Sequence, residues 1–134
     1  MGITYRDTRD IDRDVLQDLF LALEWDSGNH PDRLARAMAA SASVFTAWDG
    51  ERLIGLVSVL SDGFMAAYIH YVLVRPEYQG QGIGQRLLSM VDRTYGDVLT
   101  KVLVSNGTAV GFYERCGFRP APDKTPMFLT SLAV

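Results

Sequence analysis

Residues 79–85 read Gln-Gly-Gln-Gly-Ile-Gly-Gln, with glycines at positions 80, 82 and 84. This stretch follows an apolar run that ends near Val74, and it precedes a segment in which Leu87, Leu88 and Val91 have helical spacing. Glycine destabilises a helix interior by about 1 kcal/mol relative to alanine, so its repetition here indicates a close approach of the backbone to something else. Because free N–H groups at a helix start bind phosphate oxygens, the pattern predicts a strand, a phosphate-binding turn and a helix.

Two common nucleotide-binding motifs do not fit this stretch. A dinucleotide fingerprint needs G-x-G-x-x-G directly after the strand, but the last position of that pattern, counted from Gly80, is Gln85. A P-loop needs a lysine followed by serine or threonine, which is absent here. The simplest alternative is a tight turn in which the glycines only let the helix pack against the sheet.

The rest of the chain alternates between helical and strand patterns. Asp10 is placed to start a helix, Pro31 suits the first turn of another, and Asp49-Gly50 joins two β-rich runs as a hairpin turn. Further strands are expected at residues 67–74 and 98–104, a helix is expected after Asn106, and final short strands are expected at residues 118–119 and 127–130. This order describes one mixed sheet with helices on its faces, in a single domain over residues 1–134.

Composition excludes several classes of function. The formal net charge is -3 and no basic block is present, which disfavours nucleic acid and anionic membrane surfaces as partners. Cys116 is the one cysteine, so neither an internal disulfide nor a cysteine metal cluster is expected. With no signal peptide and no long apolar run, the chain is expected to be cytoplasmic.

Two motifs together resemble the GNAT superfamily of N-acetyltransferases. Residues 79–84 match its Q/R-x-x-G-x-G/A motif, and residues 71–78 are similar to its fourth strand and the loop that follows. Residues 106–118 are similar to its N-x-x-A-x-x-F-Y-x-x-x-G-F segment, at the separation usual for the family. The resemblance implies an α/β (α+β) fold with a single mixed, mostly antiparallel sheet of six to seven strands flanked by four helices.

The resemblance also implies acetyl-CoA as cosubstrate, with no metal. Its pyrophosphate would lie on main-chain amides of the glycine-rich stretch, and its pantetheine arm would run along the preceding strand as an added β-partner. The residues implied to bind it are Leu73, Val74, Gln79, Gln81, Gly82, Ile83, Gly84, Gln85, Asn106 and Tyr113.

Tyr113 falls on the tyrosine of the family's F-Y segment, where a phenol can protonate the departing thiolate as a general acid. A packed core tyrosine is the alternative. Asn106 falls on the family's pantetheine-contacting asparagine, and it is also well suited to be a helix N-cap.

His70 is a candidate base for the acceptor amine, because its unperturbed pKa is near 6.5. A packed histidine bonded to backbone is the alternative. Strand alternation places Tyr68 and His70 on one face and Tyr71 on the other unless the strand carries a bulge, as it does in the family. Trp25, Asp26 and Tyr68 are candidate contacts to the acceptor, since a carboxylate beside aromatic rings suits a cationic amine.

We therefore expect an N-acetyltransferase that moves the acetyl group of acetyl-CoA to a primary amine of a small molecule by direct nucleophilic attack. The alternatives are an acetyltransferase acting on a protein N-terminus or lysine, and a non-catalytic acyl-CoA-binding module. The apolar C-terminal residues 127–134 would suit pairing in a homodimer.

Overall fold

The computed structural model describes residues 2–133, and five strands in it form one sheet in the order β1-β2-β3-β4-β5. Strands β1 to β4 pair antiparallel in succession, and β5 pairs parallel to β4. The strands are β1 (Thr4–Asp7), β2 (Ser43–Asp49), β3 (Arg52–Ser61), β4 (Ala66–Val74) and β5 (Thr100–Val102). The helices are α1 (Arg13–Ala22), α2 (Pro31–Ala40), α3 (Ile83–Thr94) and α4 (Val110–Arg115), with short 3-10 turns η1 (Asp26–Asn29), η2 (Pro76–Tyr78) and η3 (Gly107–Ala109).

The expected helix starts and hairpin are present, with small shifts. Asp12 rather than Asp10 caps α1, its side chain accepting from the Asp14 N–H at 3.2 Å. Pro31 opens α2, where its missing N–H costs no hydrogen bond. Gly50, at φ 60°, turns β2 into β3.

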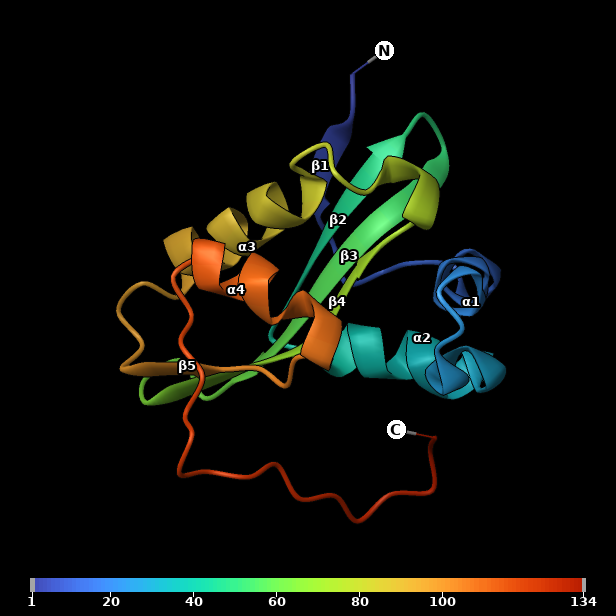
Figure 1. Ribbon diagram of the computed structural model, residues 1–134. Coiled ribbons are helices and arrows are strands. Elements are labelled where there is room, and N and C mark those ends of the chain that lie inside the picture. The colour runs from blue at the N-terminus through green and yellow to red at the C-terminus, as the bar shows by residue number, and fades with distance from the viewer. Residues whose placement is uncertain (1, 134) are drawn as a thin grey trace.

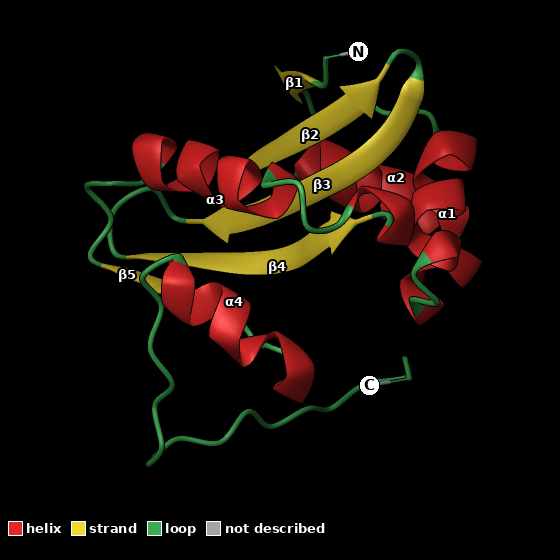
Figure 2. Cartoon of the chain, turned by 45° about the horizontal axis from the view of Figure 1, so that its top comes forward, coloured by secondary structure: helices red, strands yellow, loops and turns green. Residues whose placement is uncertain are grey.

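The prediction of six to seven strands is not confirmed, because the sheet has five. Residues 118–133, where two further strands were expected, form an extended tail without strand pairing. Pro120, Pro122 and Pro126 lie in this tail, and proline has no N–H to donate to a ladder. The tail passes below the sheet in Figures 1 and 2, and its end lies near α1 and α2.

Helices cover both faces of the sheet, as Figure 2 shows, with α3 and α4 on one face and α1 and α2 on the other. The core beneath α3 contains Ile54, Val57, Ile69 and Leu87, among others. The opposite core joins α1 and α2 to the sheet through residues such as Leu16, Phe20, Met38 and Leu73. Along residues 2–133, no helix has the length and apolarity needed to cross a membrane.

A bulge in β4 decides which face each later side chain occupies. Ser58 pairs with Tyr71 while Val59 pairs with Ile69, so His70 is the extra residue. Ile69 packs in the α3 core and Tyr71 in the α1–α2 core, although residues two apart normally share a face. The simple alternation that set Tyr71 against both Tyr68 and His70 therefore does not hold on this strand.

Candidate active site

A groove of about 630 Å³ opens where β5 separates from β4. The two strands pair only from Ala66 to Tyr68, so the outer edge of β4 beyond Tyr68 faces this groove. The groove runs from the glycine-rich loop to the end of α1. Its lining includes ten of the predicted site residues: Trp25, His70, Val74, Gln79, Gly82, Ile83, Gly84, Gln85, Asn106 and Tyr113.

The glycine-rich loop presents backbone rather than side chains. Gly80 and Gly82 have φ values of 81° and 82°, a left-handed conformation that side chains rarely adopt, and Gly82 is the N-cap of α3. Within residues 2–133, the N–H groups of residues 81–85 donate to no other backbone carbonyl, and no acidic residue occupies the first turn of α3. Free amides at the positive end of a helix dipole fit a phosphate group.

The side chains of Gln79 and Gln81 are not part of this set of free amides that fit a phosphate. The Gln79 side-chain amide donates to the Val74 carbonyl at 2.9 Å and so ties the loop to the end of β4. Gln81 lies outside the groove lining. Its main chain, not its side chain, is the part that could contact a phosphate.

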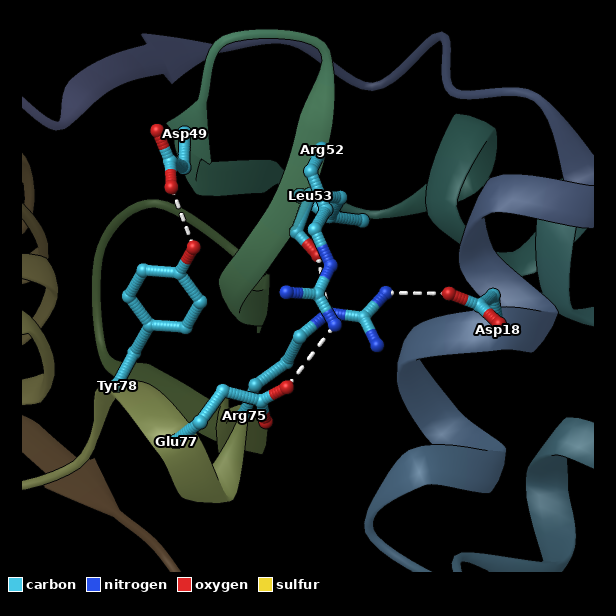
Figure 3. Close-up of polar contacts among 7 residues, drawn as sticks. All are labelled: Asp18, Asp49, Arg52, Leu53, Arg75, Glu77 and Tyr78. Atoms are coloured by element: carbon cyan, nitrogen blue, oxygen red, sulfur yellow. Dashed lines mark hydrogen bonds and ion pairs between the residues drawn. The ribbon is translucent and has the colours of Figure 1, made fainter.

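The segment between β4 and the glycines is anchored on both sides, as Figure 3 shows. Buried Arg75 donates from Nε to the Leu53 carbonyl at 2.8 Å and from Nη2 to Asp18 of α1 at 2.6 Å. The Tyr78 hydroxyl donates to Asp49. This anchoring fixes the position of the loop relative to the sheet.

Arg52 and Glu77 add an exposed ion pair of 3.0 Å beside this anchor. Glu77 therefore faces the surface of η2, on the side of the β2–β3 hairpin, and lies outside the groove lining. An exposed pair of this kind adds little stability by itself.

The open edge of β4 offers Val74 rather than Leu73 to a ligand. The Arg75 N–H donates to Ile54 on β3 at 2.8 Å, whereas the Val74 carbonyl points away from β3 and accepts from Gln79. Backbone groups alternate in direction along a strand, so those of Val72 and Val74 face the groove and those of Leu73 face β3. The Leu73 side chain is buried in the opposite core.

Tyr113 lies on α4 with its ring between Phe112 and Phe118, in edge contacts at 5.1 and 6.1 Å. Within residues 2–133 its hydroxyl has no hydrogen-bond partner. Burial, with a smaller contribution from Cys116, raises the pKa of Tyr113 above its ordinary value of 10.0. The phenol is therefore protonated at neutral pH and is able to donate that proton into the groove.

Asn106 occupies the N-cap position of η3, but its side chain makes no capping hydrogen bond there. Its backbone carbonyl accepts from Ala109 at 2.9 Å instead. The exposed amide is thus free to face the groove, which favours the ligand-contacting interpretation over the N-cap.

His70, the bulged residue, lies between two tyrosine rings. Its imidazole stacks on Tyr71 at 4.0 Å and on Tyr68 at 5.2 Å between ring centroids. Although the His70 side chain is exposed, desolvation by the neighbouring protein lowers the pKa of its imidazole below the ordinary 6.5. This favours the neutral ring, which is able to accept a proton. Tyr68 itself does not line the groove and contributes by supporting His70.

Trp25 reaches the groove because of the way α1 ends. The Trp25 N–H donates to the Phe20 carbonyl and the Glu24 N–H donates to Leu21, both at 3.0 Å, with Glu24 at φ 60°. This is a Schellman motif, and its usual apolar contact is the edge-to-face pair of Trp25 and Phe20, with ring centroids 6.5 Å apart. Helix capping therefore positions an aromatic ring at the end of the groove remote from the glycines.

Asp26 does not line the groove. Its carboxylate accepts from the Asn29 side chain and from the Ala133 N–H, both at 2.9 Å. These donors, Ala133 first and Asn29 second, lower the pKa of Asp26 below its ordinary 3.8. Asp26 thus holds the end of the C-terminal tail, which the sequence did not suggest.

Several groove residues escaped the sequence analysis. Leu23, Val72, Val104 and Arg115 gave no signal because their position beside the groove depends on how β4 and β5 separate. Phe112 stands in the F-Y motif, which did not indicate that its ring lines the groove. It also packs on the loop, since a Cβ on Gly84 would come 3.0 Å from Phe112 Cζ. Among the described residues, no three His, Cys, Asp or Glu side chains are grouped so as to hold a metal ion.

Comparison with solved structures shows the same architecture elsewhere. A GNAT family acetyltransferase from Streptococcus pneumoniae TIGR4 is 26% identical, with a TM-score of 0.85 over 97% of this chain and 98% of that one. An aminoglycoside N-acetyltransferase in complex with CoA, only 11% identical, shares the fold at a TM-score of 0.74 over 97% of this chain and 95% of its own.

Sequence comparison identifies the family. The [ribosomal protein bS18]-alanine N-acetyltransferase of Escherichia coli strain K12 is 30% identical over 118 residues, which cover 76% of this chain and 79% of the relative. Four plant and algal relatives are 36–39% identical over 73 to 82 residues, and the chain spans only 30–40% of their length. A model of the acetyltransferase (GNAT) domain matches residues 40–120. The chain belongs to the GNAT family of acetyltransferases.

Proposed function

We propose that this chain transfers the acetyl group of acetyl-CoA to the primary amine of a small molecule. The observation that carries the proposal is one continuous groove that joins free loop amides, the open edge of β4, Tyr113 and His70. Acetyl transfer from a thioester to an amine needs alignment, a neutral amine and a proton for the departing thiolate. The groove contains a group suited to each of these needs.

In this proposal the amides of residues 81–85 hold the pyrophosphate, and the backbone of Val72 and Val74 pairs with the pantetheine arm. Asn106 adds a side-chain contact to that arm. The neutral imidazole of His70 takes a proton from the acceptor ammonium, directly or through water. The free amine attacks the thioester carbonyl, the C–S bond breaks, and Tyr113 donates its hydroxyl proton to the thiolate. The nitrogen of the new amide loses one proton, which returns to the Tyr113 phenolate directly or through water.

Calorimetry with CoA and with pantetheine tests the binding part of this proposal. Pantetheine lacks the pyrophosphate, so we expect it to bind about 100-fold more weakly than CoA if the loop amides supply about 3 kcal/mol. Release of CoA thiol in the presence of an amine panel tests the transfer step. CoA binding without any amine-dependent release would favour the non-catalytic module.

A protein acceptor is the second candidate. The bS18-alanine relative, which covers more than three quarters of this chain, acts according to its name on a ribosomal protein. Peptides with free N-termini, assayed beside small amines, separate the two acceptor classes. A peptide kcat/KM well above that of every small amine would favour the protein acceptor.

We also propose that the chain forms a homodimer through its C-terminal tail. Met127, Phe128 and Leu129 in the tail are exposed, and exposed apolar segments frequently mark interfaces. Sedimentation of the full chain and of Leu129→Asp would decide it. We expect the wild type alone to show the dimer mass.

A further inference from the structure

The groove carries almost no charge of its own. Among the described residues that line it, none is an aspartate or glutamate, and Arg115 is the one permanently charged side chain. Its walls are otherwise backbone, amides, hydroxyls and apolar or aromatic groups. A cation that entered such a groove would lose its hydration without gaining a carboxylate partner, which is costly.

Three of the carboxylates next to the groove are engaged by other groups. Asp26, which directly follows Trp25, accepts from Asn29 and Ala133. Glu77 pairs with Arg52, and Asp49 accepts from Tyr78. Glu24 and Glu114 are exposed and lie outside the lining. Among the described residues, none of these carboxylates belongs to the lining of the groove.

The end of the groove remote from the glycines is apolar and aromatic. Leu23 and Trp25 line it, and the Trp25 ring meets Tyr71 at 5.4 Å between centroids. Buried Tyr71 in turn stacks on His70, and so connects the wall that Leu23 and Trp25 form with the candidate base. Such a wall suits an apolar flank on the acceptor.

Resting on the proposed acetyl transfer, we propose that the acceptor is a primary amine with an apolar flank and no second positive charge. A monoamine carries no charge once its proton has passed to His70, and His70, whose side chain is exposed, can release that proton to water. A diamine of equal length keeps one ammonium and has to bury it without a counter-charge. The apolar flank of the accepted amine packs against Leu23 and Trp25.

Matched pairs of amines test this substrate class. Hexylamine and 1,6-diaminohexane have the same length and differ in one ammonium, and the peptide amides Leu-Gly-Ala-Gly and Lys-Gly-Ala-Gly form an equivalent pair with a free N-terminus. In the pair that reacts, we expect the amine with one positive charge to have a kcat/KM at least about tenfold higher than that of the amine with two. The pair that reacts tells whether the amine belongs to a small molecule or a peptide.

A charge introduced at the groove should reverse the preference. Leu23→Glu places a carboxylate at the apolar end, and Leu23→Gln is the uncharged control. The ratio of diamine to monoamine kcat/KM should rise about fivefold or more in Leu23→Glu and stay unchanged in Leu23→Gln.

Acetyl-CoA affinity, measured by calorimetry on each variant, separates the two levels of the argument. If the wild type does not bind acetyl-CoA, the proposed function is overturned. If acetyl-CoA binds, an equal or better turnover of the dication in the reactive pair overturns the substrate class. Absence of turnover with all four amines overturns it as well.

Discussion

Gly84, in the first turn of α3, lies so close to the ring of Phe112 on α4 that a Cβ on Gly84 would come 3.0 Å from Phe112 Cζ. The contact joins the two sequence motifs, because one supplies the glycine and the other the ring. Both residues line the groove. The glycine therefore sets how closely α4 approaches the glycine-rich loop.

We expect Gly84→Ala to lower the free energy of unfolding by about 1 kcal/mol, because overpacking against Phe112 outweighs the gain in helix propensity. In a Phe112→Leu background the ring is gone, and Gly84→Ala should become neutral or stabilising. Urea unfolding of the four proteins gives the coupling energy. Strictly additive effects would contradict the contact.

Tyr113→Phe should lower kcat about 100-fold with little change in the KM for acetyl-CoA, since the ring packing is retained. Because the pKa of Tyr113 is raised above 10.0, the wild-type rate should show no tyrosine-dependent decline below pH 10. Tyr95→Phe is the matched control. It removes the buried hydrogen bond of 2.6 Å to Ser43 and should lower stability by about 1 kcal/mol while kcat is unchanged.

His70→Gln should remove the acidic limb of the kcat/KM profile. The imidazole accepts a proton only when neutral, and its pKa is lowered by desolvation, so the wild-type limb should lie below pH 6.5. His30→Gln, outside the groove lining, is the control and should keep the limb. An acidic limb that persists in His70→Gln would assign the base to another group.

Glu24→Gly should raise the free energy of unfolding by about 1 kcal/mol. Glu24 holds φ 60° at the C′ position of α1, where glycine has no Cβ penalty. Glu24→Gln keeps a Cβ and should show no gain, which separates the backbone effect from the loss of charge. Chemical denaturation measures both variants.

Asp26→Ala should speed hydrogen exchange at the Ala133 amide, because that N–H donates to the Asp26 carboxylate. The pKa of Asp26 is lowered in the folded protein, chiefly by this N–H. The interaction is therefore present above the ordinary value of 3.8 and is lost as pH falls through the lower folded value. Asp32→Ala is the control, because Asp32 is an exposed aspartate that pairs with Arg13. Hydrogen exchange at the Ala133 amide, measured by NMR, should be the same in this variant as in the wild type.

Local signals were enough for much of the fold. Pro31 at a helix start, Asp49-Gly50 at a hairpin and the glycines before α3 each act within a few residues, so their effects were readable in order along the chain. The tail shows where local reasoning failed. Apolar residues at 127–130 resemble a strand, but a strand needs a partner, and this segment pairs with no strand of the sheet.

The sequence by itself determined the two motifs of the family, the hairpin turn and the approximate starts of the helices, and it predicted which backbone would face a phosphate. Only the tertiary structure decided that β5 leaves β4 after Tyr68, that His70 is bulged between two tyrosine rings, and that Asp26 binds Ala133 instead of an acceptor. The physical reason is separation along the chain. Turn and capping preferences are properties of neighbouring residues, whereas strand separation, bulges and the Asp26–Ala133 contact arise only when distant segments pack together.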